Sequence, residues 1–567
     1  METERDEERF MSRLEVKMPG QAQAVVEQLY RNMERRIAAS PPGLCPVEMS
    51  LSFLQLCHAQ TCGKCVPCRV GLNQLAILIE QVLDRTATKE TIDLIEATAR
   101  VIADSADCAI GYEAAHMVLR GVRGFREDFE EHAFHGRCIC ALSHPVPCVS
   151  VCPAHVDVPG YVALVREERY DDAVRLIRKD NPFPSACAYV CEHPCEAQCR
   201  RRMVDDAVNI CGLKRFAVDH GTDTPIPEKA PETGKTVAII GGGPGGLTAA
   251  YYLTLMGHKV TVYEQRPKLG GMLRYGIPDY RLPQEVLDRD IDYILSAGIA
   301  VHTGVSIGKD LTMADIQRSF DAVYIAIGAH NDKKLGLEGE TSKNVVSAVE
   351  LLRGIGEGKA PDFTGKKVCV VGGGNVSMDA TRTALRLGAE SVTCVYRRRV
   401  EDMTALAEEI EEAMAEGCQI LPLQAPDRIE ADEEGKVAAL WTQPQIISRY
   451  GRDGRPTPAG AQTKEFRIPC DYVVVAIGQA IEAKPFEAVG VTTQRGAIQA
   501  DLTSAVPGLD NVFAGGDAVS GPATVIRAVA AGKVAADNID AYLGFDHKIH
   551  TDVEIPPAHL TNSPPCG

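Results

Sequence analysis

Three closely spaced cysteines stand out in the first part of this 567-residue chain: Cys62, Cys65 and Cys68 have C-x2-C-x2-C spacing, and Cys108 follows forty residues later. A short loop of thiolates covers only one side of a cubane iron–sulfur cluster, so the fourth thiolate must come from elsewhere in the chain. A zinc ion also accepts four thiolates, but zinc sites usually pair two C-x2-C hooks. The spacing therefore favours a 4Fe–4S cluster over a zinc site.

A second group of cysteines is denser, and it holds one more thiol than two four-thiolate clusters require. Its members are Cys138, Cys140, Cys148, Cys152, Cys187, Cys191, Cys195, Cys199 and Cys211. Cys148-x3-Cys152-Pro153 is typical of the end of a ferredoxin motif, in which the cysteine before proline ligates the other cluster of a pair. We therefore expect two interlocked clusters here. Cys45 and Cys57 lack partner spacing and are interpreted as ordinary buried thiols.

A glycine-rich loop follows a short apolar run at residues 237–240, with Gly241, Gly243 and Gly246 at G-x-G-x-x-G spacing. In a strand–loop–helix unit these glycines allow a tight turn, close approach of a pyrophosphate and close helix packing. The helix N-terminus then presents free N–H groups to the phosphates. A second strand ends at Glu264, which can accept hydrogen bonds from an unphosphorylated ribose. A chance glycine run in a loop is the alternative, which the register of strand, helix and acid disfavours.

The same pattern recurs at Gly372 and Gly374, with Ser377 in place of the third glycine. We align Val262-Tyr263-Glu264 with Val395-Tyr396-Arg397, which replaces the acid by Arg397, with Arg398 and Arg399 behind it. A guanidinium can bind the 2′-phosphate that a carboxylate would repel, so this second site is predicted to bind NADP(H). The alternative is a solvated basic strand end.

Regular elements must hold these motifs in place. Periodicity predicts helices at 21–37, 72–83, 91–102, 378–387, 405–416 and 523–539 with an amphipathic pair at 158–181, and strands at 237–240, 259–263, 321–328, 368–371, 471–478 and 511–517. Strands that alternate with helices predict an α/β fold with two dinucleotide-binding domains, preceded by two mainly helical iron–sulfur domains. Residues 222–234 are rich in proline and charge and are interpreted as a linker.

Composition limits the class of protein. The hydrophobic content of 45% fits folded globular domains, and no apolar run reaches the roughly 18 residues that span a bilayer. The acidic start METERDEER does not resemble a signal peptide, so we expect a cytoplasmic protein. A net charge of -17 argues against nucleic acid or an anionic membrane as the main partner, although such a charge also serves simple solubility.

Two cysteine-rich segments resemble known iron–sulfur modules. CGKCVPCRVG and CAIG resemble the C-terminal module of the NADH-binding flavoprotein subunit of respiratory complex I, whose flavin- and NADH-binding parts are absent here. PCVSVCPAHVDVPGYV, NPFPSACAYVCEHPCEAQC and NICGLKRFAVDHG resemble the N-terminal domain shared by the glutamate synthase small subunit, the NADPH-binding subunit of electron-bifurcating transhydrogenases and dihydropyrimidine dehydrogenase. That resemblance implies one cluster on Cys138, Cys140, Cys148 and Cys199, and another on Cys152, Cys191 and Cys195. The fourth ligand of the cluster on Cys152, Cys191 and Cys195 stays open between Cys187, Cys211 and a non-cysteine group near Lys214.

The same family resemblance extends to the flavin. LGGMLRYGIPDYRLP resembles the segment that lies along the flavin in the glutamate synthase small-subunit family, although a surface loop is the alternative, and Asp517 matches the aspartate that binds the ribityl chain. The complete predicted cofactor-binding set is Gly241, Gly243, Pro244, Gly245, Gly246, Glu264, Gly271, Gly276, Ile277, Pro278, Gly328, Gly372, Gly374, Asn375, Ser377, Asp379, Arg397, Arg398, Gly478, Gly516, Asp517 and Thr524. Hydride transfer needs no obligatory acid or base, so no catalytic side chain is predicted.

Module order resembles the NADPH-binding FAD subunit of an electron-bifurcating NAD- and ferredoxin-dependent NADP transhydrogenase. The resemblance implies FAD, NADP(H), three 4Fe–4S clusters, ferredoxin, and NADH-handling flavoprotein and iron–sulfur partners similar to complex I components. Cys369, Cys394, Cys418 and Cys470 form no C-x2-C pair, so electrons are expected to leave the flavin through the clusters. The alternatives are a glutamate synthase small subunit and an NADPH-linked adaptor for a hydrogenase or formate dehydrogenase. We expect a helical 4Fe–4S module at 1–135, a helical domain with two 4Fe–4S clusters at 136–233, and an FAD-binding domain formed by 234–338 and 471–546. An NADPH-binding domain is expected at 339–470, and a docking or flexible tail at 547–567.

Overall fold

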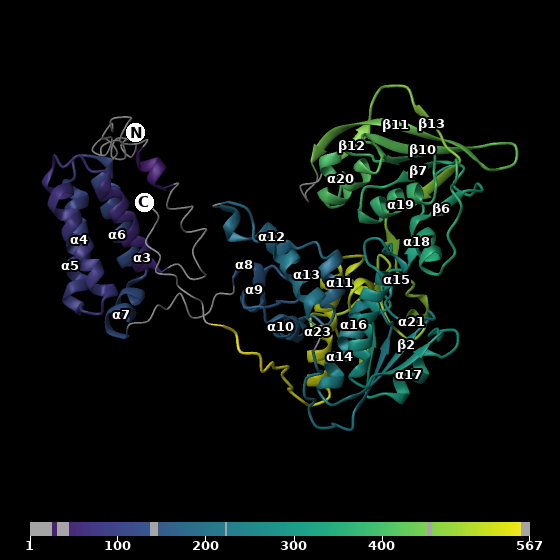
Figure 1. Ribbon diagram of the computed structural model, residues 1–567, viewed down its shortest axis with the longest axis horizontal. Helices are drawn as coiled ribbons and strands as arrows, with labels where there is room; N and C mark the ends of the chain where they lie inside the picture. The colour runs from purple at the N-terminus through teal and green to yellow at the C-terminus, as the bar shows by residue number, and fades with distance from the viewer. Residues whose placement is uncertain are drawn as a thin grey trace, which may run out of the picture. The chain divides into compact units, whose positions relative to one another are not determined.

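The computed structural model describes residues 25–30, 45–135, 146–203, 205–221, 224–450 and 456–556. These residues fall into two compact units, the first within Met1–Val151 and Pro194–Val208 and the second within Cys152–His193 and Asn209–Gly567. Figure 1 shows the elements of both units in chain order. No described helix is both long enough and apolar enough to cross a lipid bilayer.

The first unit is built from helices. They are α3 (Pro46–Ala59), the π-helix η1 (Pro67–Gly71), α4 (Leu72–Leu83), α5 (Lys89–Ser105), α6 (Ala109–Gly124), α7 (Arg126–His135), α8 (Pro147–Ser150), α12 (Pro194–Ala197) and the 3-10 helix η3 (Arg200–Met203). The predicted helix at 72–83 is α4, and the one at 91–102 lies inside α5. Of the helix predicted at 21–37, the described residues 25–30 are helical.

Helices α3 to α6 pack around one apolar core (Figure 1). Leu72, Leu75, Ile79 and Val82 recur at helical spacing on α4, and all four are fully buried, because this face meets α3 and α5. Cys45 and Cys57 also lie in this core, as expected for buried thiols. The spacing of apolar residues therefore fixes the helical scaffold from which the first cysteine group projects.

The second unit begins with four helices: α9 (Val158–Arg166), α10 (Tyr170–Asp180), α11 (Pro184–Val190) and α13 (Ile210–His220). Helices α9 and α10 are the amphipathic pair predicted at 158–181. On α10 the buried residues Ala173, Val174, Leu176 and Ile177 form one face, and α10 contacts α9, α13 and α11. Helix α11 in turn contacts α16, so these helices pack directly on the nucleotide-binding part of the unit.

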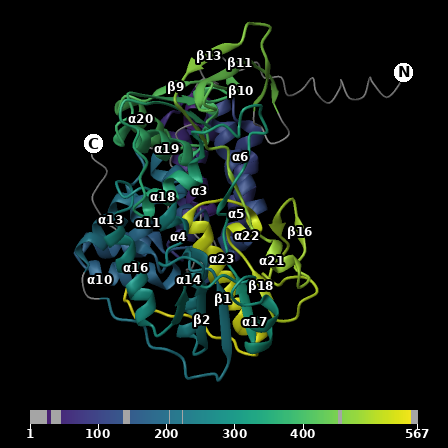
Figure 2. The same ribbon diagram turned by 90° about the vertical axis from the view of Figure 1, so that its right-hand side faces the viewer.

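The first parallel sheet has strand order β18-β4-β1-β2-β3. Its strands are β1 (Thr236–Ile240), β2 (Lys259–Glu264), β3 (Ala300–Thr303), β4 (Ala322–Ile325) and β18 (Val512–Ala514), and the helices around it are α14 (Pro244–Leu255), α15 (Met272–Tyr275), α16 (Gln284–Ser296), α17 (Met313–Ser319), α22 (Asp517–Ser520) and α23 (Val525–Tyr542). Helix α14 is buried along nearly its whole length because it lies beside both β1 and α23 (Figure 2). A Cβ atom on Gly532 of α23 would lie 2.3 Å from the carbonyl oxygen of Gly245, so glycine permits this close approach.

The second parallel sheet, β6-β14-β7-β8-β9, repeats the same arrangement. Its strands are β6 (Val345–Ser347), β7 (Lys367–Val371), β8 (Ser391–Val395), β9 (Gln419–Leu421) and β14 (Tyr472–Val475), with helices α18 (Ala348–Gly356), α19 (Asn375–Arg386) and α20 (Ala407–Ala415). An antiparallel sheet of β10 (Gln424–Ala431), β11 (Val437–Tyr450), β12 (Pro456–Gly460) and β13 (Phe466–Pro469) is inserted before β14. The short remaining elements are β5 (Asn331–Asp332), β15 (Gln479–Ala480), β16 (Thr493–Gln494), β17 (Ala497–Ile498), α21 (Lys484–Glu487) and the 3-10 helix η4 (Val400–Asp402). Two sheets of matching order confirm the predicted α/β class with two dinucleotide-binding folds.

Candidate functional site

The first glycine-rich loop connects β1 to α14 as the spacing predicts. Gly241 has φ +114°, and a Cβ atom there would lie 2.4 Å from the carbonyl oxygen of Ala326. At Gly246 a Cβ atom would lie 2.0 Å from the carbonyl oxygen of Gly241, so a larger residue would push α14 away from the strand. By contrast, a Cβ atom on Gly243 would touch only the Cα of Gly271 at 3.7 Å. The second glycine therefore leaves room for a phosphate where the first and third serve the turn and the packing.

Glu264 closes β2 and is fixed by the backbone of the loops around it. Its side chain accepts hydrogen bonds from the Gly242 N–H at 2.7 Å and from the Arg266 N–H at 2.8 Å. Burial raises the pKa of this carboxyl, and the hydrogen bonds from Arg266 and Gly242 act in the opposite direction. A carboxylate held in this way lies ready at the end of the strand to accept a ribose hydroxyl.

A cleft of about 220 Å³ opens at the carboxyl ends of β1, β2 and β4. The predicted cofactor-binding residues that line it are Gly241, Gly243, Pro244, Gly245, Glu264, Gly271, Gly328, Gly516 and Asp517. Burial raises the pKa of Asp517 to about 6, and an N–H from Ala523 acts against this shift. Gly516 next to it has no heavy atom within 4 Å of an added Cβ position, so its backbone is open to a ligand. These residues fit an elongated nucleotide such as FAD.

Five predicted residues lie outside the lining of this cleft: Gly246, Gly276, Ile277, Pro278 and Thr524. Gly276 is the C-cap of α15, and the Pro278 carbonyl accepts hydrogen bonds from the N–H groups of Arg281 and Leu282. The segment at 276–278 thus forms a turn between α15 and α16. Thr524 is the N-cap of α23 but makes no side-chain capping bond.

Several lining residues were missed by sequence reasoning, among them Arg266, Met272 and His330. Burial, with added repulsion from Arg266 and Arg353, lowers the pKa of His330 to about 4, so its imidazole is neutral at physiological pH. His330 carries no motif of its own. Its position two residues after Gly328, beyond the carboxyl end of β4, is the one signal that could have identified it.

The second glycine-rich loop has the predicted geometry, but the predicted strand alignment was wrong by one residue. Ile240 pairs with Tyr263 in the first sheet, and Val371 pairs with Val395 in the second. Tyr396, and not Arg397, therefore occupies the position of Glu264, and its ring lies within 2.4 Å of where a Cβ atom on Gly373 would be. The turn between helix and strand, Gly388 to Glu390, is one residue longer than Gly257 to His258, whereas the predicted alignment required two extra residues.

A second cleft of about 620 Å³ lies at the carboxyl ends of β7, β8 and β14. Its lining includes Gly372, Gly374, Asn375, Arg397, Arg398 and Gly478 from the predicted set. Ser377 lies outside the lining, because its hydroxyl accepts a hydrogen bond from the Gly374 N–H at 3.2 Å and donates one to the Ala476 carbonyl at 3.4 Å. The carboxylate of Asp379 also lies outside it and accepts two hydrogen bonds from Arg281 Nη1, at 2.9 and 3.0 Å.

The three arginines after β8 have different surroundings. Arg399 pairs with Asp402 at 2.9 Å, and Arg398 Nε donates to the Pro456 carbonyl at 2.7 Å. Arg397 is exposed and forms no hydrogen bond or ion pair with any described residue. Two guanidinium groups that line a cleft with a phosphate-type loop fit a nucleotide that carries an extra phosphate on its ribose.

The first unit brings the four predicted ligands of the first cluster together. Cys68 lies on η1, Cys62 and Cys65 precede it, and Cys108 is the N-cap of α6. Burial, with Cys65, Cys108 and Cys62 as neighbours, raises the pKa of Cys68 to about 12. A Cβ atom on Gly111 would lie 2.6 Å from Cys68 Sγ, so the glycine of the CAIG segment leaves the space that this thiol occupies.

The ligands predicted for the other two clusters divide between the units. Cys148 on α8, Cys195 on α12 and Cys199 belong to the first unit, in which α8 and α12 are in contact. Cys152 and Cys191 belong to the second unit. Cys138 and Cys140 lie outside the described residues.

Among the described candidates for a fourth ligand in the second unit, Cys211 and Cys187 differ clearly. Burial raises the pKa of Cys191, on which Lys214, Cys211 and Cys152 also act. Cys211 is partly exposed, and both it and Cys152 lie near Cys191. Cys187 is fully buried, and its thiol donates a weak hydrogen bond to Asn181 Oδ1 at 3.9 Å. Cys211 donates a hydrogen bond to the Ala188 carbonyl at 3.6 Å, and Cys187 also lies near Cys191, so the fourth ligand stays open between them.

Comparison with known families fits this geometry. The pyridine nucleotide-disulphide oxidoreductase family model matches residues 235–532, which contain both parallel sheets. The chain belongs to this family. In front of the oxidoreductase region, residues 48–132 match the NADH-ubiquinone oxidoreductase-F iron-sulfur binding region, and residues 124–225 match dihydropyrimidine dehydrogenase domain II, 4Fe-4S cluster.

Relatives of this oxidoreductase share most of its length. The NADP(+)-dependent formate dehydrogenase subunit beta of Moorella thermoacetica is 34% identical over 87% of this chain and 79% of its own. The NADPH-Fe(3+) oxidoreductase subunit beta of Geobacter sulfurreducens is 36% identical over 91% of this chain and 82% of its own. Among solved structures, FprA from Mycobacterium tuberculosis shares 20% identity with a TM-score of 0.49, covering 56% of this chain and 85% of that one.

These matches confirm the predicted class of the oxidoreductase. It is an NADP-dependent FAD/iron–sulfur oxidoreductase with 4Fe–4S modules, as its two nucleotide-binding folds and its cysteine-rich regions indicated. The predicted total of three clusters and the individual site residues stay predictions.

Proposed function

We propose that this chain is the NADPH-handling subunit of a multi-subunit oxidoreductase that passes electrons singly, through 4Fe–4S clusters, to another polypeptide. The observation that carries the proposal is the pair of clefts at equivalent edges of two sheets with matching strand order, one with Glu264 and the other with Arg397 and Arg398. When bound, FAD supplies the exchange between a two-electron hydride and single electrons. The cysteine-rich modules supply one-electron carriers.

The chain's own residues bind and orient in this proposal. The loop from Gly241 to Gly246 and the N-terminus of α14 hold the flavin pyrophosphate, and Glu264 accepts the ribose hydroxyl. Arg397 and Arg398 hold the 2′-phosphate of NADP(H) beside the loop at Gly372. Asp517 accepts a hydroxyl of the ribityl chain. None of these groups gives or takes a proton in the transfer itself.

The relatives that match most of this chain support an adaptor that exchanges electrons between NADP(H) and a partner such as a formate dehydrogenase, without bifurcation of its own. Two such relatives, which match 87% and 91% of this chain, are the beta subunits of an NADP(+)-dependent formate dehydrogenase and of an NADPH-Fe(3+) oxidoreductase. A glutamate synthase small chain of Escherichia coli is 32% identical over 70% of this chain. The helical module at 48–132 favours the adaptor over that function, since a glutamate-forming partner has no need for it.

A second candidate is the NADPH-binding subunit of an electron-bifurcating transhydrogenase. It is favoured by the module at 48–132, which would connect this subunit to an NADH-handling flavoprotein and iron–sulfur partner similar to complex I components. Ferredoxin would then be the low-potential acceptor. Both candidates place the chain in the cytoplasm, where reduced thiols are available for cluster ligation.

One experiment separates the two candidates. The intact complex is purified without oxygen, and NADPH-dependent reduction of ferredoxin is followed with and without NAD⁺. An adaptor reduces its co-purified partner's acceptor at the same rate under both conditions. Bifurcation requires NAD⁺, so a rate of ferredoxin reduction that NAD⁺ does not change would exclude bifurcation. A flavin that NADPH does not reduce would contradict the proposed function altogether.

A further inference from the structure

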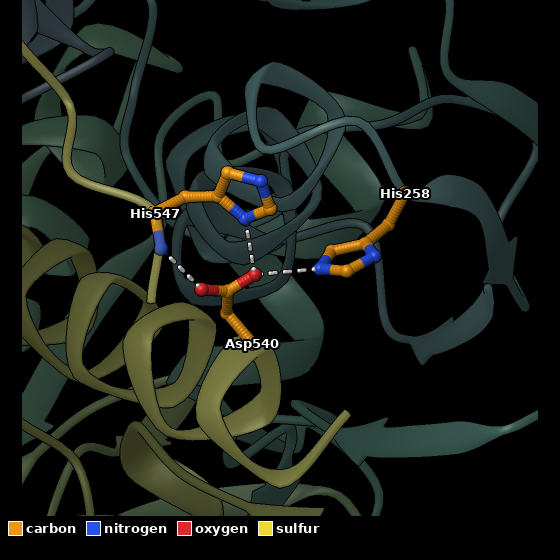
Figure 3. A group of neighbouring side chains, drawn as sticks. All are labelled: His258, Asp540 and His547. Atoms are coloured by element: carbon orange, nitrogen blue, oxygen red, sulfur yellow. Dashed lines mark hydrogen bonds and ion pairs between the residues drawn. The ribbon is translucent and has the colours of Figure 1, made fainter. Parts of the chain in front are cut away.

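A group of three side chains outside both clefts brings two imidazoles to one carboxylate (Figure 3). His258 lies in the turn between α14 and β2, Asp540 lies on α23, and His547 lies in the segment that follows α23. Asp540 Oδ1 is 2.9 Å from His258 Nε2 and 2.7 Å from His547 Nδ1. One nitrogen from each histidine and one oxygen thus converge on a single point.

The surroundings of this group already hold its members in position. His258 Nδ1 lies 2.7 Å from Thr233 Oγ1, and Asp540 Oδ2 accepts the backbone N–H of His547 at 2.8 Å. The hydrogen bond between Thr233 and His258 corresponds to the outer hydrogen bond that usually fixes the tautomer and ring orientation of a metal-binding histidine. Phe545 packs against both imidazoles, edge-on to His258 at 5.6 Å and stacked on His547 at 5.3 Å between ring centroids.

The carboxylate is buried without a permanent cation. The side chains of His258 and Asp540 are 0% and 2% exposed, and no Lys or Arg of the described chain forms an ion pair with Asp540. Asp537 lies near enough for Asp540 and Asp546 to add to the rise of its pKa, which comes mainly from burial and which Lys533 and Lys548 oppose. A buried negative charge is costly unless a positive partner offsets it. Among the described groups the two imidazoles contact the carboxylate directly, whereas the exposed Lys548 acts on it only through space and pairs with Asp546 at 2.6 Å, so a bound cation would offset the buried charge more fully.

We propose that His258, Asp540 and His547 form a binding site for a zinc-type divalent cation, which fastens the segment after α23 to the turn between α14 and β2. Two imidazole nitrogens and one carboxylate oxygen are a ligand set that zinc accepts. In a tetrahedral site neighbouring ligand atoms are about 3.3 Å apart, given metal–ligand distances of about 2.0–2.2 Å. To bind the ion, the distance from Asp540 Oδ1 to each of the two histidine nitrogens therefore has to increase by about half an ångström. The side chain of His547 is 24% exposed, which leaves the fourth position to water.

The test uses the full chain with its iron–sulfur clusters, prepared without oxygen and dialysed against a buffered low concentration of zinc. Zinc and iron per chain are measured by mass spectrometry, and zinc coordination by X-ray absorption. The proposal predicts about one zinc per chain with nitrogen and oxygen neighbours at about 2.0–2.2 Å, whereas zinc in a cysteine site would show sulfur at about 2.3 Å. Iron content must stay constant, so that displaced cluster iron is not mistaken for this site.

Variants locate the ion. His547 lies on a surface segment, so the His547→Ala variant should still fold. This variant should lose the zinc that is bound through nitrogen and oxygen. The exposed His550, three residues along the same segment, provides the matched control, and His550→Ala should keep it. Thr233→Val should weaken zinc binding 10- to 100-fold, as loss of an outer hydrogen bond typically does. Zinc seen only with sulfur neighbours, or zinc binding that is equal in His547→Ala, would overturn the proposal and leave a hydrogen-bonded anchor.

Discussion

Two side chains at equivalent strand ends distinguish the clefts. Glu264 is buried and engaged by two backbone N–H groups, whereas Tyr396 occupies its place in the second sheet and is followed by Arg397 and Arg398. A carboxylate suits a free ribose hydroxyl, and a guanidinium suits a ribose phosphate. The carboxylate would repel that phosphate. The proposed discrimination between NADPH and NADH thus rests on a few side chains at one strand end.

The double variant Arg397→Ala/Arg398→Ala should lower kcat/KM for NADPH at least about tenfold while kcat/KM for NADH changes little. Charge-assisted hydrogen bonds contribute about 1.5 kcal/mol or more, and about 1.4 kcal/mol corresponds to a factor of ten. Arg399→Ala is the matched control, because Arg399 already pairs with Asp402. Steady-state kinetics with both nucleotides measures the effect, and unchanged NADPH kinetics in the double variant would refute the assignment.

Gly111 carries a prediction for the first cluster. An added methyl group would lie 2.6 Å from Cys68 Sγ and 2.9 Å from the Cβ of Ala106. Gly111→Ala should therefore displace the thiol and lose about four irons per chain, the content of one cubane. Gly124→Ala on the same helix has open space around it and should retain all iron. Full iron content in Gly111→Ala would argue against Cys68 as a ligand.

At the scale of elements, each strand–loop–helix unit could be predicted because its signals are local. A β-branched run, small residues at G-x-G-x-x-G or G-x-G-x-x-S spacing and a following helix identify β1 with α14 and β7 with α19. The register of β8 could not be predicted, since the length of the turn before it sets the register of the whole strand, and that length has no clear signal in the sequence. Contacts between distant segments, such as Asp379 with Arg281, have no local signal and emerge only from the packed structure.

An ion-pair network joins the turn before α16 to helices α19 and α20. Arg281 pairs with Asp379 at 2.9 Å and with Glu409 at 2.7 Å, and Arg382 pairs with Glu409 at 2.9 Å. Most of these side chains are buried, so loss of one partner would leave a costly unpaired charge. The network links the flavin-type fold to the second nucleotide fold and thereby holds the two clefts in one arrangement.

Asp379→Asn should change how stability depends on pH. Burial raises the pKa of Asp379 from 3.8 to about 6, although Arg281 opposes the shift. Between these values the folded chain binds a proton that the unfolded chain has released, so this residue's contribution to stability falls as pH rises toward 6 and is constant above it. The melting temperature of the wild type relative to that of the variant should therefore fall as pH rises toward 6 and stay constant above it. A difference that is flat across this window, measured by calorimetry, would contradict it.

At the scale of the whole molecule, the chain places its carriers in order along the sequence. Fifteen of the 20 cysteines precede residue 212, and both nucleotide folds lie within residues 235–532. The proposal thus assigns two-electron chemistry to residues 235–532 and the one-electron carriers to the residues before 212. The absence of a C-x2-C pair among Cys369, Cys394, Cys418 and Cys470 fits this division, because a redox-active C-x2-C disulfide is the usual alternative acceptor in such flavoproteins.

The most direct test mixes NADPH with the cluster-loaded chain in the absence of oxygen and follows flavin absorbance together with the electron paramagnetic resonance of reduced clusters. We predict that NADPH bleaches the flavin, that a signal from at least one reduced 4Fe–4S cluster follows, and that NADH is at least about tenfold slower. A chain that binds no flavin, or whose reduced flavin leaves every cluster oxidised, would contradict the account.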